Sequence, residues 1–182
     1  MTKALWQTER KYECKKFCLS NIYFCIGLLI IFFQILPLQT TPQTWSGPNV
    51  LLVFFAAIVT KRPEFTSSFL IAFIFLIEDF FLMRPPGLMP SLTVLGFYFL
   101  KRKFQHQEES PLMFGWGSVA TCLTLILLLF YFISVLLFIP SAGLRLTLME
   151  IIVTLALYPI FSVLIGSFAK LDTADAEKMI QR

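Results

Sequence analysis

The chain alternates apolar runs with short polar connections, and this pattern predicts helices rather than strands. The apolar runs cover residues 19–38, 49–60, 65–83, 88–100, 115–139 and 146–169. Four of them are long enough to cross the ~30 Å hydrocarbon layer of a bilayer at ~1.5 Å per residue. The pattern therefore predicts an all-α protein, a polytopic transmembrane helical bundle with six helices, two of them short.

Helix-breaking residues separate several of the runs. Residues 39–48 read QTTPQTWSGP, residues 85–87 read PPG, and residues 140–143 read PSAG. Proline and glycine end helices, because proline lacks a backbone N–H and glycine adopts conformations that a helix does not use. Pro159 lies inside the last run, where it predicts a kink.

The two short runs, 49–60 and 88–100, leave the number of membrane crossings open. About 13 residues rise only ~20 Å, so each run either spans a thinned bilayer or re-enters and is buried by other helices. We expect six crossings, because residues 50–59 read VLLVFFAAIV and are apolar on every face. Such a helix has nothing with which to line a wet cavity.

Composition and charge favour a membrane protein and predict its orientation. Hydrophobic residues make up 57% of the chain and charged residues 14%, whereas a soluble domain is about a quarter charged. With six crossings, 13 Lys and Arg residues lie inside and two outside; with four crossings, the numbers are 12 and three. The positive-inside rule places both termini in the cytoplasm in either case. We expect a basic cytoplasmic segment at 1–18, one transmembrane domain at 19–169 and a cytoplasmic tail at 170–182.

The sequence predicts neither catalysis nor metal binding. The single histidine, His106, lies in a polar connection and has no obvious serine or cysteine partner. Cys14 and Cys18 are four residues apart, but a zinc site needs further ligands nearby. No glycine-rich phosphate loop is present. We therefore expect no enzymatic activity and no cofactor, and we assign the net charge of +4 to orientation and contact with membrane lipid, not to nucleic acid.

Two adjacent acids, Glu78 and Asp79, lie late in the run 65–83. Ionisable residues inside membrane helices are costly, and they are candidates for function. Neighbouring residues on a helix point about 100° apart, so the two acids are expected to do different things. Asp79 shares a face with the small residues Ser68 and Ala72, and this face is expected to point into the bundle.

Three further charges, Arg84, Arg145 and Glu150, are expected in the outer half of the bundle. Together with Glu78 and Asp79, they are predicted to meet around one outward-facing depression. Three interpretations are open at this point: ion pairs that fix helix packing, a docking surface for another membrane protein, or a small-molecule site.

The order of several features along the chain is more informative than any one of them. A basic turn with Arg62, Pro63 and Glu64 follows a short apolar run, Asp79 comes late in the next helix, and a proline–glycine pair ending at Gly87 opens another short run. In this order, and in its size, basic N-terminus and closing pair of long helices, the chain resembles MreD, a family of rod shape-determining membrane proteins of bacteria. The resemblance covers essentially the whole chain, and it extends to the five residues just named.

The resemblance implies a non-enzymatic component of the cell-wall elongation complex in the inner membrane. Such a protein binds the bitopic scaffold MreC. Through MreC, it connects MreB filaments to a RodA-type glycosyltransferase and its penicillin-binding transpeptidase, the peptidoglycan synthases that maintain rod shape. The chain also looks distantly like the substrate-binding membrane subunits of energy-coupling-factor vitamin transporters, which have six helices. That alternative function requires an outer pocket with converging polar groups.

Overall fold

The computed structural model describes residues 2–36, 47–63, 66–105, 112–139 and 143–180, and these residues form helices and no strand. Six helices follow one another through the described residues: α1 Thr2–Ile35, α2 Val50–Lys61, α3 Ser68–Phe81, α4 Leu88–Gln105, α5 Leu112–Leu136 and α6 Leu144–Ile180. The prediction of an all-α protein with six helices is confirmed.

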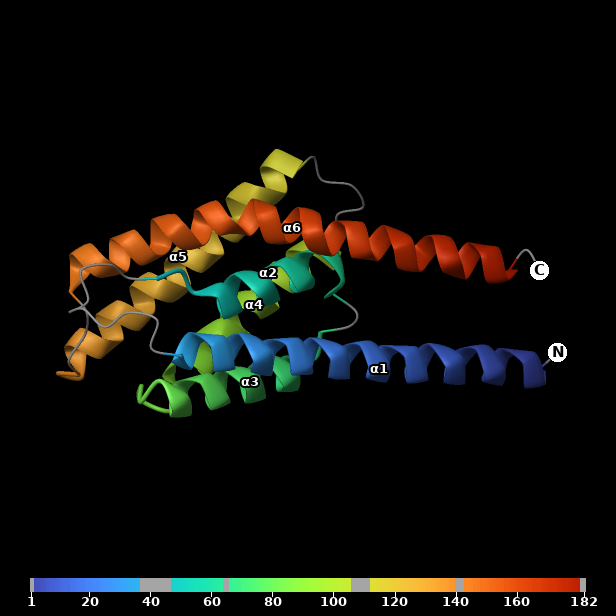
Figure 1. The fold of residues 1–182 in the computed structure, drawn as a ribbon, viewed down its shortest axis with the longest axis horizontal. Coiled ribbons are helices and arrows are strands. Elements are labelled where there is room, and N and C mark those ends of the chain that lie inside the picture. The colour runs from blue at the N-terminus through green and yellow to red at the C-terminus, as the bar shows by residue number, and fades with distance from the viewer. Residues whose placement is uncertain (1, 37–46, 64–65, 106–111, 140–142, 181–182) are drawn as a thin grey trace.

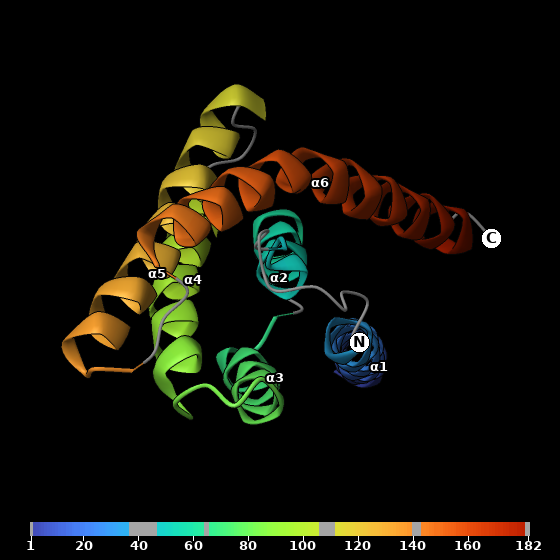
Figure 2. The same cartoon turned by 60° about the vertical axis from the view of Figure 1, so that its left-hand side comes forward.

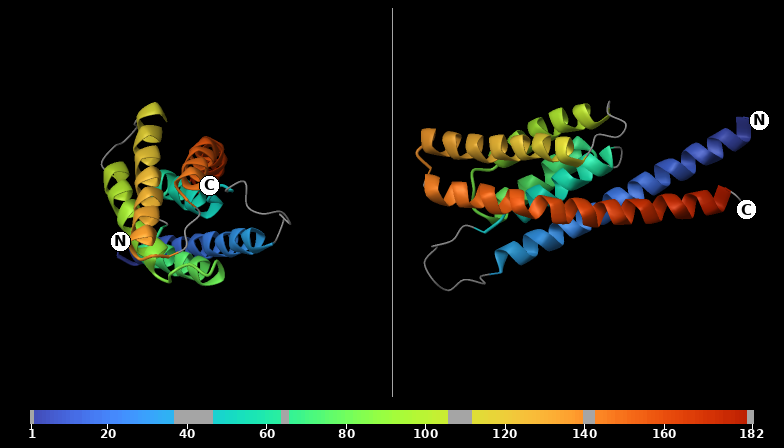
Figure 3. Two further views of the ribbon diagram at one scale, coloured as in Figure 1. Left: turned by 90° about the vertical axis from the view of Figure 1, so that its left-hand side faces the viewer. Right: turned by 90° about the horizontal axis from the view of Figure 1, so that it is seen from above.

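Each helix runs antiparallel to the one before it, so the chain passes back and forth along one bundle (Figure 1). Both chain termini, the end of α2, the start of α3 and the end of α4 lie toward one end, which we call the terminal end. The end of α1, the starts of α2, α4 and α6, and the end of α3 lie toward the other, which we call the turn end (Figures 1 and 3).

The shortest helix, α2, forms the centre of the bundle. Figure 2 shows it surrounded by α1, α3, α4 and α6. Every residue from Leu51 to Val59 is buried, as expected for a helix that is apolar on every face. Helices α6, α4, α1 and α5 pack on it, and the ring of Phe55 lies 5.8 Å from that of Phe75 in α3. Both the six-crossing arrangement and the re-entrant arrangement bury α2, so the number of crossings stays a prediction.

Within the part of the chain that the structure describes, two helices are long and apolar enough to cross a membrane, namely Gly115–Leu136 within α5 and Leu144–Ser167 within α6. In each, only 28% of the most apolar stretch is buried inside the bundle. Large apolar side chains such as Phe132 of α5 and Val163 of α6 are exposed instead. Exposure on this scale is unfavourable in water and favourable in lipid, so it supports association with a membrane.

Three helices are longer than their apolar runs. Helix α1 begins at Thr2 rather than at residue 19, α4 ends at Gln105 rather than at residue 100, and α6 ends at Ile180 rather than at residue 169. No proline or glycine interrupts residues 2–18 or 170–180, so the helices continue through polar sequence. Helix α6 also contains Pro159 and bends along its length (Figure 2), as a kink at this proline predicts.

Two glycines allow neighbouring helices to approach closely. A Cβ atom on Gly27 of α1 would collide with the end of the Ile74 side chain of α3. A Cβ atom on Gly96 of α4 would lie 2.7 Å from Cδ1 of Ile126 in α5. Small residues provide this kind of close contact between helices in membranes. These two glycines therefore fix the spacing between α1 and α3 and between α4 and α5.

Replacing Gly27 by alanine is expected to lower the free energy of unfolding by about 1–3 kcal/mol, because the added methyl group overpacks the contact with Ile74. Unfolding of the detergent-solubilised chain, followed by circular dichroism, measures the change. Gly117→Ala in α5 is the matched control, since nothing lies within 4 Å of a Cβ atom there. The double variant Gly27→Ala/Ile74→Val should lose less than the sum of its single variants. Equal losses for Gly27→Ala and the control would contradict the close contact.

Candidate functional site

Asp79, near the end of α3, joins this helix to the start of α4. Its side chain is fully buried, with 0% of its surface exposed, as its position on the inner face predicted. Its Oδ2 atom accepts hydrogen bonds from the backbone N–H of Gly87 at 3.1 Å and from that of Met89 at 3.3 Å. The first N–H groups of a helix have no partner within it, so this carboxylate caps α4 from a neighbouring helix. The positive end of the helix dipole adds a favourable interaction.

The turn between α3 and α4 brings these groups together. Arg84 donates its backbone N–H to the backbone oxygen of Asp79 at 3.0 Å. Gly87, directly before α4, has a φ angle of 94°, which residues with a Cβ atom rarely adopt. Glycine at this position therefore allows the turn to aim its N–H at the carboxylate. Asp79 and Gly87 depend on each other, one for the acceptor and the other for the backbone conformation.

Glu78 differs from its neighbour in its contacts. It is also 0% exposed, yet neither of its carboxyl oxygens has a hydrogen-bond partner within the described part of the chain. Oδ1 of Asp79 is likewise unpartnered there. Burying a carboxyl group without hydrogen bonds costs free energy. The two acids thus differ in their contacts, because Asp79 caps a helix while neither oxygen of Glu78 has a hydrogen-bond partner among the described residues.

The structure brings only some of the other outer charges to this pair. The guanidinium carbon of Arg84 lies 5.4 Å from the ring centroid of Phe130 in α5, a cation–π distance. Glu150 of α6 is partly buried, and both it and Arg84 lie close enough to Glu78 for their charges to act on it. Arg145, in the first turn of α6, is exposed and is not among the charges that act on Glu78. We call Glu78, Asp79, Arg84 and Glu150 the acidic cluster.

The acidic cluster takes no part in either of two cavities that lie between neighbouring helices. One cavity of about 740 Å³ lies between α4 and α5. A second, of about 400 Å³, lies between α3 and α4 and includes Ser68 and Ala72. None of the five predicted outer charges lines either cavity. Both acids are fully buried, whereas Arg84 and Glu150 are partly buried and Arg145 is exposed. The depression around all five charges therefore stays a prediction.

The basic turn lies at the opposite end of the bundle. Arg62 directly follows α2 and is only 8% exposed. Its backbone oxygen accepts a hydrogen bond from the Thr66 hydroxyl at 3.3 Å, and Nζ of Lys101 donates to the backbone oxygen of Thr66 at 3.0 Å. Pro63 is partly buried, and Glu64 lies outside the described residues. The two halves of the sequence pattern therefore form two separate joints, one at each end of α3.

Sequence reasoning missed the polar contacts that fix α2 against α6. The Asn49 side chain accepts a hydrogen bond from the N–H of Leu52 at 3.1 Å. The backbone N–H of Asn49 donates to Oγ1 of Thr154 in α6 at 3.2 Å. Near the other end of α2, the hydroxyl groups of Thr60 and Tyr158 lie 3.2 Å apart. An asparagine directly before an apolar run predicts the N-cap of a helix. Its partner on α6 is 105 residues away, and no local pattern indicates such a contact.

A comparison of the chain with protein-family models, with curated proteins and with solved structures found no match in any of the three. Within the residues that the structure describes, no group of three or more His, Cys, Asp or Glu side chains is arranged to hold a metal ion. His106 and the side chains of Cys14 and Cys18 lie outside that part of the chain. What the described site does chemically is hydrogen bonding and charge interaction between helices.

Replacing Asp79 by alanine is expected to lower the free energy of unfolding by about 2 kcal/mol, because two buried N–H groups at the start of α4 lose their acceptor. Asp79→Asn keeps one acceptor oxygen and is expected to lose less. Denaturation in detergent gives the stability, and amide hydrogen exchange should show faster opening of the first turn of α4 in the alanine variant. An alanine variant as stable as the unmodified protein would rule out the capping role.

Replacing Glu78 by methionine is expected to leave the free energy of unfolding unchanged or to raise it by about 1 kcal/mol or more. A side chain of similar size then occupies the site without unsatisfied oxygens, and such replacements of buried charged groups are often stabilising. The same denaturation experiment, run beside Asp79→Ala, measures it. A loss as large as that of Asp79→Ala would show that Glu78 has a partner in the folded protein.

Proposed function

We propose that this chain is a non-enzymatic, multi-pass protein of the bacterial inner membrane and a component of the cell-wall elongation complex. It acts in the manner of the MreD family that it resembles, by binding a bitopic scaffold of the MreC type. Through the scaffold, it connects MreB filaments to a RodA-type glycosyltransferase and its penicillin-binding transpeptidase. Its six helices all cross the membrane, and both termini are cytoplasmic.

The contact between Asp79 and Gly87 carries this proposal. These residues of the family-like pattern lie eight positions apart, and Oδ2 of Asp79 accepts the backbone N–H of Gly87 at 3.1 Å. The order of the pattern thus has a physical reason, since an acid late in one helix fixes the start of the next where a glycine permits the turn. If the acid and the glycine of the pattern occurred together by chance, no hydrogen bond between them would be expected.

The distribution of basic residues supports the proposed orientation. Residues 61–62 and 101–103 are basic. The first pair lies at the end of α2 and the second group lies near the end of α4, both toward the terminal end, where both chain termini lie (Figure 1). Arg84 and Arg145 adjoin the end of α3 and the start of α6, at the turn end. The positive-inside rule then assigns the terminal end to the cytoplasm.

Helix α3 offers a face for the membrane-crossing helix of the scaffold. Four of its side chains, which we call the α3 seam, are exposed large apolar groups: Phe69, Phe73, Leu76 and Phe80. They follow one another at spacings of four, three and four residues, the repeat with which two helices pack side by side. A bitopic protein supplies one such helix, and van der Waals packing drives helix association in lipid. We therefore assign the α3 seam to the scaffold.

The alternative function, a substrate-binding subunit of an energy-coupling-factor vitamin transporter, requires converging polar groups around its solute. The larger cavity is lined mainly by apolar side chains, and none of the predicted outer charges takes part. The alternative therefore serves as the opposing outcome of the experiment below.

Affinity purification of the tagged chain in mild detergent, with mass spectrometry of what accompanies it, tests the proposal. The unmodified chain should bring down a bitopic scaffold together with a wall polymerase and a transpeptidase. The variant Phe69→Ala/Phe80→Ala should lower recovery of the scaffold about tenfold or more, because large aromatic anchors dominate interface energies. Its control, Phe132→Ala, removes a phenylalanine of α5 that is 71% exposed and should leave recovery unchanged.

Two results contradict parts of this proposal. Recovery of ATPase subunits with a coupling membrane protein, accompanied by vitamin uptake that depends on the chain, replaces the scaffold function with the transporter. Equal recovery of the scaffold with the seam variant and with Phe132→Ala removes the α3 seam as the docking face. Circular dichroism of each purified variant shows whether a loss of recovery reflects unfolding instead.

A further inference from the structure

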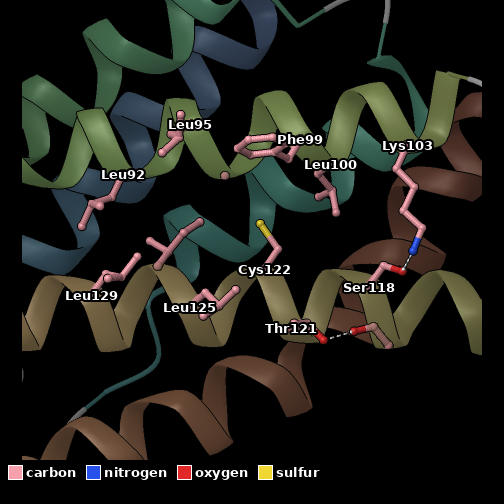
Figure 4. Close-up of a pocket in the computed structure, with 13 residues that line it drawn as sticks. Leu92, Leu95, Phe99, Leu100, Lys103, Ser118, Thr121, Cys122, Leu125 and Leu129 are labelled. Atoms are coloured by element: carbon pink, nitrogen blue, oxygen red, sulfur yellow. Dashed lines mark hydrogen bonds between the residues drawn. The ribbon is translucent and has the colours of Figure 1, made fainter.

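A groove runs along α4 and α5, apart from the acidic cluster and the α3 seam. Its volume is about 740 Å³, within the ~300–1,000 Å³ range of ligand pockets. Figure 4 shows leucines and a phenylalanine along most of its length and two polar side chains, Lys103 and Ser118, at one end. This end belongs to the last turn of α4, so it faces the terminal end of the bundle.

The polar end of the groove is suited to an anion. Nζ of Lys103 donates a hydrogen bond to Oγ of Ser118 at 2.6 Å. The hydroxyl of Thr121, one helical turn further along α5, also lines the groove but donates its hydrogen to the backbone oxygen of Gly117 at 2.8 Å, so Lys103 is the donor that an anion would meet. Gly117 lines this end too, and nothing lies within 4 Å of a Cβ atom there, so the space beside the cation is open. A lysine that already holds a hydroxyl group can donate its remaining N–H bonds to a phosphate oxygen.

The length of the groove matches one leaflet of a bilayer rather than the whole bilayer. Its lining follows α4 from Leu92 to Lys103, a rise of about 16 Å at 1.5 Å per residue. One leaflet contributes about half of the ~30 Å hydrocarbon thickness. A groove made for a crossing helix of a partner is expected to continue through both leaflets.

We propose that this groove binds one phospholipid with an anionic headgroup, drawn from the leaflet at the terminal end of the bundle. The phosphate lies against Lys103 and Ser118, and an acyl chain lies along the leucines of α4 and α5. The cation at the headgroup depth and the apolar lining below it match the two parts of such a lipid. The proposal uses the orientation given above, but it does not depend on any partner of the elongation complex.

Native mass spectrometry of the full chain, released from detergent with added lipid, tests this proposal. Phosphatidylglycerol should bind more tightly than phosphatidylcholine with the same acyl chains. Lys103→Gln should weaken the first phosphatidylglycerol about fivefold, the value for one basic residue at a membrane surface. Arg102→Gln is the matched control, because Arg102 is an exposed cation of the same turn that does not line the groove. It should leave the affinity unchanged.

A second variant tests the apolar part of the groove. Leu125 lines it and is 53% exposed, so Leu125→Trp fills the space without altering the core and should abolish the tightly bound lipid. A photoreactive side chain at position 125, activated in the native membrane, should form adducts with phospholipid. Adducts with a protein helix, equal losses for Lys103→Gln and Arg102→Gln, or equal affinity for the two lipids would each overturn the proposal.

Discussion

The structure depends on one constraint, that helices which start inside apolar surroundings must have their first N–H groups satisfied by the protein itself. Of the three helices that start at the turn end, α2 and α4 have buried residues at their starts, Asn49 and Met89, whereas Leu144 at the start of α6 is exposed. At the start of α2, the side chain of Asn49 accepts the N–H of Leu52, and Thr154 of α6 accepts the backbone N–H of Asn49. Asp79 of α3 meets the same constraint at the start of α4. Each start is thereby tied to a different neighbouring helix, and these ties hold the short central elements in register with the long outer ones.

This constraint explains why two adjacent acids differ so sharply. Asp79 supplies the hydrogen-bond acceptor that the buried start of α4 requires. The positive φ angle of Gly87 turns the backbone N–H of that residue toward the carboxylate of Asp79. Glu78 meets no such requirement, since its oxygens have no hydrogen-bond partner among the described residues. Asp79 is therefore the member of the acidic cluster that positions α4. The surfaces on which other molecules bind are to be sought on the outer faces of the helices.

The sequence predicts those features that depend on neighbouring residues and misses those that depend on distant ones. Apolar runs and the PPG break give six helices, and the 100° step between adjacent positions predicts separate roles for Glu78 and Asp79. Polarity misplaces the start of α1, because a helix does not end where its sequence merely becomes polar. The contact of Gly27 with Ile74 and that of Asn49 with Thr154 depend on how the helices pack. No local periodicity contains that information, and each contact joins segments far apart in the chain.

Helix α4 links the two proposed binding surfaces and explains why they can act separately. Its start is held by Asp79 of α3. Its last turns are held by the bond from Lys101 to the backbone oxygen of Thr66, which lies just before α3. The α3 seam lies on one side of this unit, and the groove with α5 lies on another, at a contact whose closeness Gly96 permits. Substitutions of exposed side chains on one surface are expected to leave the other intact, because the α3 seam and the groove share no residue. The buried joint at Asp79 is common to both, since it sets the position of α4 relative to α3 and, through α4, relative to α5.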